Sequence, residues 1–204
     1  MILYVFISCK SRIDKNYNRI TNMMDKLNCD NYIIVTGGNT ENNYSQDKHL
    51  LEIDCNDYYE GLPEKVIKTY KFINENELFK KFTHFCKVDD DMIINQIINT
   101  DILNDYCGKA ENLNISPDRR WHINRCSINS KFNTTEYTGR YVPWCAGGHG
   151  YIVSRKSLNI LASEKNYYNE IYEDIYIAKT LYDKNIYPTN ISELKKYFYS
   201  NDHR

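Results

Sequence analysis

The stretch FTHFCKVDDD (residues 82–91) decides the fold. Phe82 to Val88 is rich in residues that favour an extended backbone, so it predicts a strand. Asp89, Asp90 and Asp91 then emerge together at the carboxyl end of that strand, the edge where ligands bind in an open α/β sheet. Three adjacent carboxylates favour a hard cation such as Mg²⁺ or Mn²⁺, which could in turn hold a diphosphate. A solvated acidic turn is the alternative interpretation, because runs of charge usually face water.

The residues before this strand alternate between strand-like and helix-like patterns. Continuous apolar runs predict buried strands at 2–8, 32–36 and 50–53. Apolar residues at helical spacing predict helices at 16–27 and 62–81. Alternation of this kind is typical of a nucleotide-binding α/β fold.

The remainder of the chain has a more irregular pattern. Helical spacing predicts helices at 93–106, 156–162 and 173–183, the second of them capped by Ser154. An extended segment is predicted at 121–128, and the apolar residues 151–153 follow a group of glycines. Because no repeat or low-complexity linker interrupts the sequence, we expect a single domain over residues 1–204, with residues 1–95 and 96–204 as merged halves.

Composition places the chain among globular proteins. Its 204 residues are 42% hydrophobic and 26% charged, with a formal net charge of −1, which offers no basic field for nucleic acid or an anionic membrane. No apolar run reaches the roughly 20 residues that span a bilayer, and no signal-peptide pattern is present at the start. Seven scattered cysteines without a C-x-x-C pair favour thiols in a reducing compartment over a zinc site. We therefore expect a cytoplasmic or otherwise soluble intracellular protein without an integral membrane segment; its oligomeric state is open.

Two further motifs carry chemistry of their own. Glu173 and Asp174 open a predicted helix, where carboxylates complement the helix dipole but can also act as a general base for a hydroxyl. In WCAGGHGY (residues 144–151), Gly147 and Gly148 let the backbone approach a ligand closely. Trp144 could stack on a sugar or a base, and a tight turn with a core tryptophan is the alternative.

The order and spacing of these motifs resemble the β1,3-galactosyltransferase and fringe family. That family carries a D-D-D, a G-G-x-G-[YF]-x-x-S stretch and an E-D-V-like motif, which residues 89–91, 147–154 and 173–175 match in this order. Residues 57–65 are similar to its D-x-Y-x-N-L-x-x-K segment, although Gly61 replaces the asparagine, and His149 stands where a small residue is usual. The N-terminal anchor and stem of the Golgi members are not matched, so we expect a bare catalytic domain.

The resemblance implies a GT-A fold, with a nucleotide-sugar half over residues 1–95 and an acceptor half over residues 96–204. It also implies an inverting transfer of a hexose or N-acetylhexosamine, with galactose favoured, from a UDP-sugar to an acceptor hydroxyl, such as one on a glycan, through a β1,3-type linkage. Asp174 is the expected base and Glu173 the second candidate. Mn²⁺ or Mg²⁺ is expected on Asp91 and Asp89, with His203 as a candidate third ligand.

The remaining expected contacts follow from the same resemblance. The donor is expected to meet residues after the first strand and around the motifs: Ser8, Cys9, Lys10, Arg12, Lys65, Asp89, Asp90, Gly147 and Gly148. Asp90 is expected to orient the ribose or a metal-bound water, and Lys65 to meet the diphosphate or to support the site. Trp144 and His149 are expected on the acceptor side.

Other functions fit parts of the pattern. A catalytically inactive sugar-binding homologue would keep the motifs, although intact Asp89, Asp91 and Asp174 argue against it. A metal-dependent phosphoryl-transfer enzyme could hold two metals with the same carboxylates, but the net charge offers no nucleic-acid footprint. An EF-hand is excluded, because Thr100 and Ile94 stand where its loop needs Glu and Gly.

Overall fold

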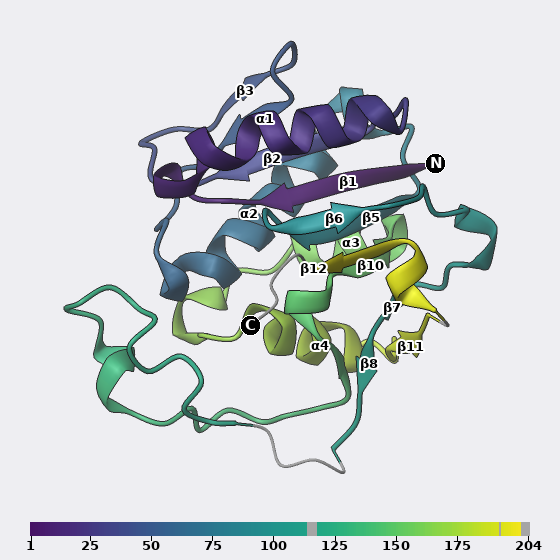
Figure 1. The fold of residues 1–204 in the computed structure, drawn as a ribbon. Coiled ribbons are helices and arrows are strands. Elements are labelled where there is room, and N and C mark those ends of the chain that lie inside the picture. Colours follow the sequence, from purple (N-terminus) through teal and green to yellow (C-terminus); the bar gives the residue numbers. More distant parts are fainter. Residues whose placement is uncertain (114–117, 192, 201–204) are drawn as a thin grey trace.

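An eight-stranded mixed sheet forms the centre of the computed structural model, which describes residues 1–113, 118–191 and 193–200 (Figure 1). The strand order is β11-β7-β10-β5-β1-β2-β4-β3. Four central strands run parallel: β1 (Ile2–Ile7), β2 (Tyr32–Thr36), β4 (Leu50–Glu52) and β5 (His84–Asp89). The others are β3 (Asn43–Ser45) and β10 (Tyr151–Ser154), both antiparallel to their neighbours, and the edge pair β7 (Tyr106–Gly108) and β11 (Thr189–Asn190). Strands from both sides of residue 95 therefore share one sheet.

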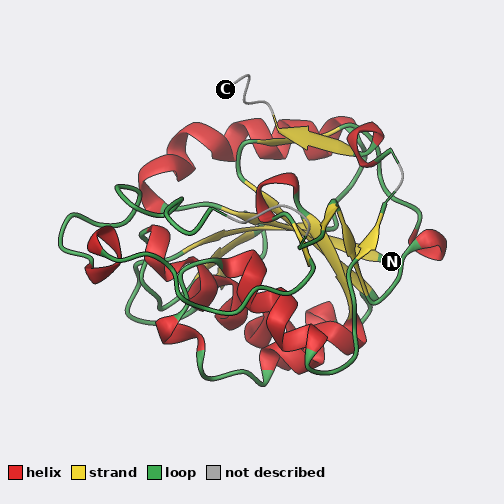
Figure 2. Cartoon of the chain, turned by 90° about the horizontal axis from the view of Figure 1, so that it is seen from below, coloured by secondary structure: helices red, strands yellow, loops and turns green. Residues whose placement is uncertain are grey.

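Helices cover both faces of this sheet. They are α1 (Lys10–Lys26), α2 (Leu62–Glu75), α3 (Arg155–Ala162) and α4 (Glu173–Tyr182). α1 lies on one face, and α2, α3 and α4 lie on the other (Figures 1 and 2). β1 is buried from both sides, because Val5 joins the apolar cluster beneath α2 to α4 while Tyr4 and Phe6 join the cluster beneath α1. Such continuous apolar strands are typical of a parallel sheet between two helical layers.

Short elements complete the fold. Two small ribbons pair β6 (Met92–Ile94) with β12 (Phe198–Ser200) and β8 (Ala110–Glu111) with β9 (Trp144–Cys145). Short 3₁₀ helices are η1 (Tyr59–Gly61), η2 (Glu77–Phe79), η3 (Thr100–Ile102), η4 (Lys131–Thr134), η5 (Gly147–His149), η6 (Tyr167–Asn169) and η7 (Leu194–Lys196).

Most of the predicted elements are confirmed. The strands predicted at 2–8, 32–36, 50–53 and 82–88 are β1, β2, β4 and β5. The helices predicted at 16–27, 156–162 and 173–183 are α1, α3 and α4, although α1 begins earlier, at Lys10. Ser154 caps α3, since its side chain accepts a hydrogen bond from the backbone N–H of Ser157. α2 ends at Glu75 rather than 81, because the Asn76 side chain accepts from the N–H of Leu78 and starts η2.

Two predicted elements are wrong. The helix expected over 93–106 is replaced by β6, η3 and β7: Ile94 lies opposite Phe198 in the ladder with β12, and the N–H of Asn95 donates to the Tyr197 carbonyl at 2.7 Å. Pairing with a distant segment therefore overrides an ambiguous apolar run. The strand expected over 121–128 is a set of turns, in which the buried ring of His122 bonds Tyr172 and the carbonyl of Thr135.

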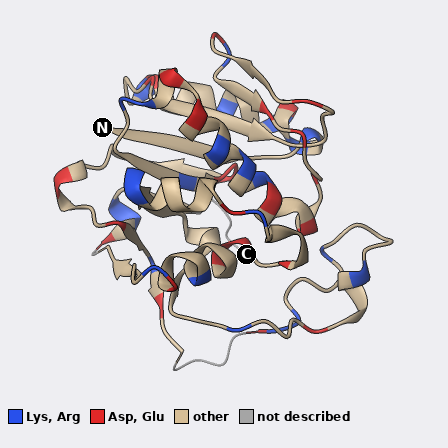
Figure 3. Ribbon diagram, turned by 180° about the vertical axis from the view of Figure 1, so that it is seen from behind, with Lys and Arg blue, Asp and Glu red and all other residues tan. Residues whose placement is uncertain are grey.

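Charges of both signs are interspersed along the chain (Figure 3), in keeping with the net charge of −1. Of the helices in the described ranges, none combines the length and the apolar character needed to span a bilayer.

Candidate active site

A cavity of about 530 Å³ lies at the carboxyl ends of β1 and β5. The two strands are parallel neighbours with Ile7 opposite Asp89, so the residues that follow them meet at one edge of the sheet. The lining includes residues of all three motifs found in the sequence: Asp89, Asp90, Asp91, Gly147, Gly148, Glu173 and Asp174. The sequence stretches that suggested a ligand site thus converge on one concave surface.

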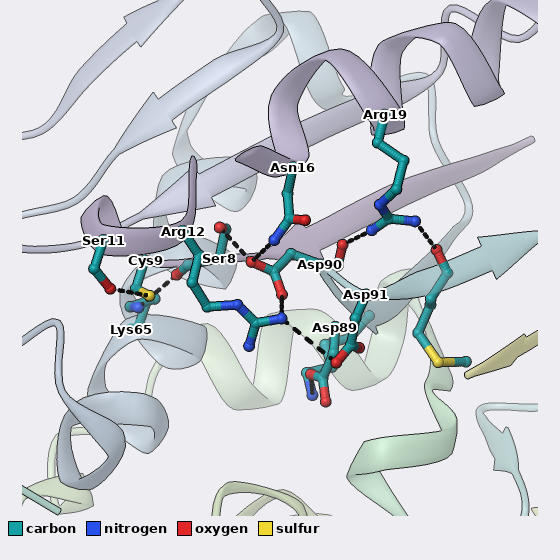
Figure 4. A network of polar contacts seen from close by, with 12 residues as sticks. Ser8, Cys9, Ser11, Arg12, Asn16, Arg19, Lys65, Asp89, Asp90 and Asp91 are labelled. Carbon is teal, nitrogen blue, oxygen red and sulfur yellow. Dashed lines mark hydrogen bonds and ion pairs between the residues drawn. The ribbon is translucent and has the colours of Figure 1, made fainter. Parts of the chain in front are cut away.

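Asp90 is the structural member of the acidic triplet (Figure 4). Its buried carboxylate accepts hydrogen bonds from Ser8 Oγ at 2.6 Å and Asn16 Nδ2 at 2.8 Å, and Arg12 Nη2 lies 2.6 Å from Oδ1. Burial raises the pKa of Asp90, and these three partners oppose the rise. Because both carboxylate oxygens are occupied, Asp90 fastens the start of α1 to the end of β5.

Asp89 and Asp91 are the exposed members of the triplet, with 36% and 30% of their side chains accessible. Asp89 Oδ1 lies 2.7 Å from Lys87 Nζ, and Asp91 Oδ2 lies 3.4 Å from Arg12 Nη2. The second oxygen of each carboxylate has no partner among the described residues. Two such carboxylates fit a Mg²⁺ or Mn²⁺ ion whose shell is completed by phosphate and water.

No group of three or more His, Cys, Asp or Glu side chains within the described ranges could hold a metal by itself. His203, the third ligand expected from the sequence, lies outside the described residues. Asp89 and Asp91 are therefore two carboxylates that could contribute to a metal site, with the other ligands supplied from outside this pair.

Lys87 connects the three motifs, and the sequence analysis missed it. Its side chain is 1% exposed, and its ammonium lies 2.7 Å from Asp89 Oδ1 and 3.4 Å from Glu173 Oε2, and donates to the Gly147 carbonyl at 3.4 Å. Burial disfavours the charged form, but the carboxylates of Asp89 and Glu173 raise the pKa of Lys87 above its ordinary value. The available signal was a lysine inside an apolar strand, since a buried ammonium needs charged partners.

Glu173 is buried on the other side of Lys87. Its carboxylate accepts a hydrogen bond from the Tyr151 hydroxyl and is only 3% exposed. Burial raises the pKa of Glu173 to about 7; Asp174 adds to the rise and Lys87 opposes it. Glu173 thus belongs to an internal charge network that spans β5, β10 and α4.

Asp174 lies beside Gly147 and has its carboxylate fixed by backbone. Oδ2 accepts from the N–H of Gly147 and Oδ1 from the N–H of Ile175, both at 2.9 Å. Burial raises the pKa of Asp174, whereas these two N–H groups lower it. A Cβ at Gly147 would lie 3.1 Å from Asp174 Cβ and 3.2 Å from Glu173 Oε2. The glycine is therefore needed for this close approach to the acidic pair.

Lys65 supports the cavity through Asp57. Its buried ammonium lies 2.6 Å from Asp57 Oδ1 and donates to the Ser8 carbonyl at 2.7 Å. Asp57 also accepts from the N–H groups of Lys10 and Gly37, each at 2.7 Å. This ion pair, of which Lys65 is buried and Asp57 partly buried, ties the loop after β1 to the end of β2 and to α2.

Some expected site residues are brought to the cavity and some are not. Ser8, Cys9, Arg12 and Lys65 line it together with the motif residues. Three lie outside its lining: the Lys10 ammonium donates to Asn39 and to the Gly38 carbonyl, Trp144 packs edge-on against Tyr141, and His149 is exposed in η5. Their expected contacts with donor and acceptor stay predictions.

Aromatic residues in the lining of the cavity were not predicted from the sequence. Tyr58, Tyr59, Trp121 and Tyr172 line it, with Arg125 beside them. Tyr59 belongs to η1 and Tyr58 precedes it, Trp121 lies in the loop after β8, and Tyr172 precedes α4. These positions are far apart in the sequence, so only the fold reveals that they line one cavity.

Comparison with known proteins was made on sequence and on structure. The galactosyltransferase family profile matches residues 36–192, more than half of the chain. Comparison with curated protein sequences gave no significant match. Among solved structures, A197 from STIV is similar with a TM-score of 0.52 and 12% identity, over 99% of this chain and 95% of that chain.

A glycosyltransferase involved in the glycosylation of the major capsid of PBCV-1 aligns with a TM-score of 0.47 and 11% identity, over 99% of this chain and 94% of that one. The expected fold class, a single mixed α/β domain of the GT-A type, is confirmed. The family match carries the assignment: the chain belongs to the galactosyltransferase family and is a glycosyltransferase.

Proposed function

We propose that the chain transfers a sugar, with galactose the favoured candidate, from a UDP-sugar to an acceptor hydroxyl, with inversion at C1 and a β1,3-type linkage. The observation that carries the proposal is that one cavity is lined both by Asp89 and Asp91 and by the acidic pair Glu173 and Asp174, with the Lys87 ammonium in contact with Asp89 and Glu173. Transfer of a sugar needs two such groups of side chains, one to offset the charge of the leaving diphosphate and one to accept the proton of the attacking hydroxyl.

Asp174 is the proposed base. Its carboxylate would take the proton of the acceptor hydroxyl as that oxygen forms the bond to C1, while the bond from C1 to the diphosphate oxygen breaks and UDP leaves with the electron pair. A raised pKa favours proton transfer near neutral pH, and the Gly147 and Ile175 amides fix the orientation of the carboxylate. Glu173 is less suited, because Lys87 and Tyr151 occupy its buried carboxylate.

The donor end would be formed by the residues around the acidic triplet. Asp89 and Asp91 would hold Mn²⁺ or Mg²⁺, which when bound supplies positive charge to offset that of the leaving diphosphate. Ser8, Cys9 and Arg12 line the cavity after β1, where the nucleotide would bind. Because its ammonium is committed to Asp57 and Ser8, Lys65 would support this loop rather than meet the diphosphate.

The test is UDP release from UDP-galactose, UDP-glucose and UDP-N-acetylglucosamine, each with Mn²⁺ or with EDTA. Asp174→Asn should lower the rate by about 10²- to 10⁴-fold, the usual contribution of a general base, while UDP binding by calorimetry persists. Asp91→Asn should weaken the binding of UDP in Mn²⁺. Asp47→Asn, in the exposed turn between β3 and β4, is the matched control and should behave as wild type.

Equal rates for wild type and Asp174→Asn would refute the base. If no UDP-sugar raises the melting temperature in the presence of metal, the donor class is wrong. If the wild-type protein binds a UDP-sugar but releases no UDP with any acceptor tested, the result would instead favour the inactive sugar-binding homologue.

A further inference from the structure

The loop over residues 118–143, at the lower left of Figure 1, contributes Trp121 and Arg125 to the wall of the cavity. His122 Nδ1 lies 2.8 Å from the Tyr172 hydroxyl, and Tyr172 directly precedes the acidic pair. Further along, the N–H of Ser127 donates to Glu60 at 3.0 Å. These two hydrogen bonds hold the loop against η1 and against the residue that precedes α4.

Trp121 and Arg125 form a stacked pair on this wall. The Arg125 guanidinium carbon lies 3.9 Å from the centre of the Trp121 ring, and its Nε donates to the Trp121 carbonyl at 2.7 Å. Although one face of the indole is covered in this way, 53% of Trp121 is exposed. An aromatic side chain that is left exposed in the lining of a cavity is typical of a ligand-binding surface.

Arg125 differs from the other cations of the cavity. Four basic side chains line it within the described residues, and three are paired with carboxylates: Arg12 with Asp90 and Asp91, Lys65 with Asp57, and Lys87 with Asp89 and Glu173. Arg125 has no carboxylate partner there, and its Nη groups donate to no described residue. Its planar donor fork is therefore available to an anion of the ligand.

Tyr59 lines the same cavity as Arg125 and Asp174, and the pKa of its phenol responds to both charges. Burial raises the pKa of the Tyr59 phenol, the Asp174 carboxylate raises it further, and the Arg125 guanidinium lowers it. Both charges therefore lie within electrostatic range of one ring. The hydrogen bond between His122 and Tyr172 holds the loop that carries Arg125 next to the residue that precedes the acidic pair.

We propose that Trp121 and Arg125 form an acceptor subsite for an acidic sugar, whose carboxylate pairs with the Nη groups at the edge of the guanidinium and whose ring lies beside the exposed part of the indole. This inference rests on the proposed function, and it makes the acceptor a glycan that bears a uronic-acid residue. The neutral and the acidic form of one sugar ring then differ chiefly in the contact with Arg125.

The first test is binding of methyl β-D-glucuronide against the uncharged methyl β-D-glucoside at matched ionic strength. The chain has two tryptophans, so Trp144→Phe leaves Trp121 as the sole indole reporter. We expect saturable quenching by the glucuronide at about tenfold lower concentration than by the glucoside, in line with a charge-assisted pair. Adding Arg125→Gln should abolish the difference between the two ligands.

Arg120→Gln is the matched control, because Arg120 lies on the same loop, is exposed and pairs with Glu136 rather than lining the cavity. It should retain the preference for the glucuronide. Saturation-transfer NMR on the unaltered chain gives a second readout that does not depend on the Trp144→Phe background. Equal affinity for the two sugars, or an unchanged preference in Arg125→Gln, would overturn the proposed subsite.

A parallel titration with UDP and Mn²⁺ separates the two proposals. UDP binding without a glucuronide response refutes the acceptor subsite and leaves the donor class intact. A saturable, Arg125-dependent glucuronide response without UDP binding supports the subsite and refutes the UDP donor. Failure of both titrations refutes both.

Discussion

Glu173→Gln should change how the stability of the protein depends on pH. The unfolded chain ionises Glu173 near its ordinary pKa of 4.5, whereas the folded protein holds the proton until about pH 7. Between these values the folded state binds one more proton than the unfolded state, so the free energy of unfolding falls as pH rises. At about 1.4 kcal/mol per pKa unit, the loss amounts to about 3 kcal/mol by pH 8.

The glutamine variant lacks this titration. Its amide keeps the size of the side chain, and any fixed cost of facing Lys87 with an amide does not vary with pH. The difference in unfolding free energy, wild type minus variant, should therefore fall by about 3 kcal/mol from pH 4.5 to pH 8. Urea unfolding in EDTA at several pH values measures this slope.

Glu75→Gln provides the matched control, because Glu75 is exposed at the end of α2 and its difference from wild type should stay nearly flat. A flat difference for Glu173→Gln would show that burial and Lys87 cancel at this carboxyl. A difference that rises with pH would mean that Lys87 lowers the pKa below 4.5, and the account of the charge network would be wrong.

The remaining predictions concern the support of the site. Lys65→Met should lower the free energy of unfolding by about 3–5 kcal/mol, because it leaves the Asp57 carboxylate without its buried partner. Urea unfolding measures this loss, and a loss below about 1 kcal/mol would contradict the reasoning. Gly147→Ala should lower the rate of transfer, because the added methyl group displaces Asp174, while the melting temperature changes little. In Gly148→Ala the methyl group meets nothing within 4 Å, so this variant should keep the wild-type melting temperature. Equal effects of the two glycine variants on both quantities would refute this distinction.

The sheet edge of the site could be predicted because it depends on local signals. A buried strand that ends in carboxylates places Asp89 to Asp91 at a carboxyl edge, and the apolar runs identify β1 and β5 without knowledge of their pairing. The register that brings Ser8 to Asp90 needed the structure, because the two residues are far apart in the sequence.

Other parts of the site depend on contacts that local patterns do not encode. Lys87 belongs to the network only because β10 and α4 bring Tyr151 and Glu173 to it. Trp121 was assigned to a strand from its β-favouring neighbours, yet no strand pairs with it, and the ring of His122 sets the loop instead. Both the charge network of Lys87 and the conformation of the loop at Trp121 therefore depend on side chains that are distant in the sequence.

The distribution of thiols has a consequence for covalent chemistry. Cys29, Cys55, Cys86, Cys107 and Cys145 are buried, and burial also raises the pKa of Cys126, which is partly exposed. Cys9 is the other partly exposed thiol, and it lines the cavity directly after β1. An electrophile attached there would occupy the proposed nucleotide end and leave the Trp121 wall open. Cys9 could therefore be used to attach a donor analogue covalently in the cavity, and the binding of free acceptors to that modified protein could then be measured one at a time.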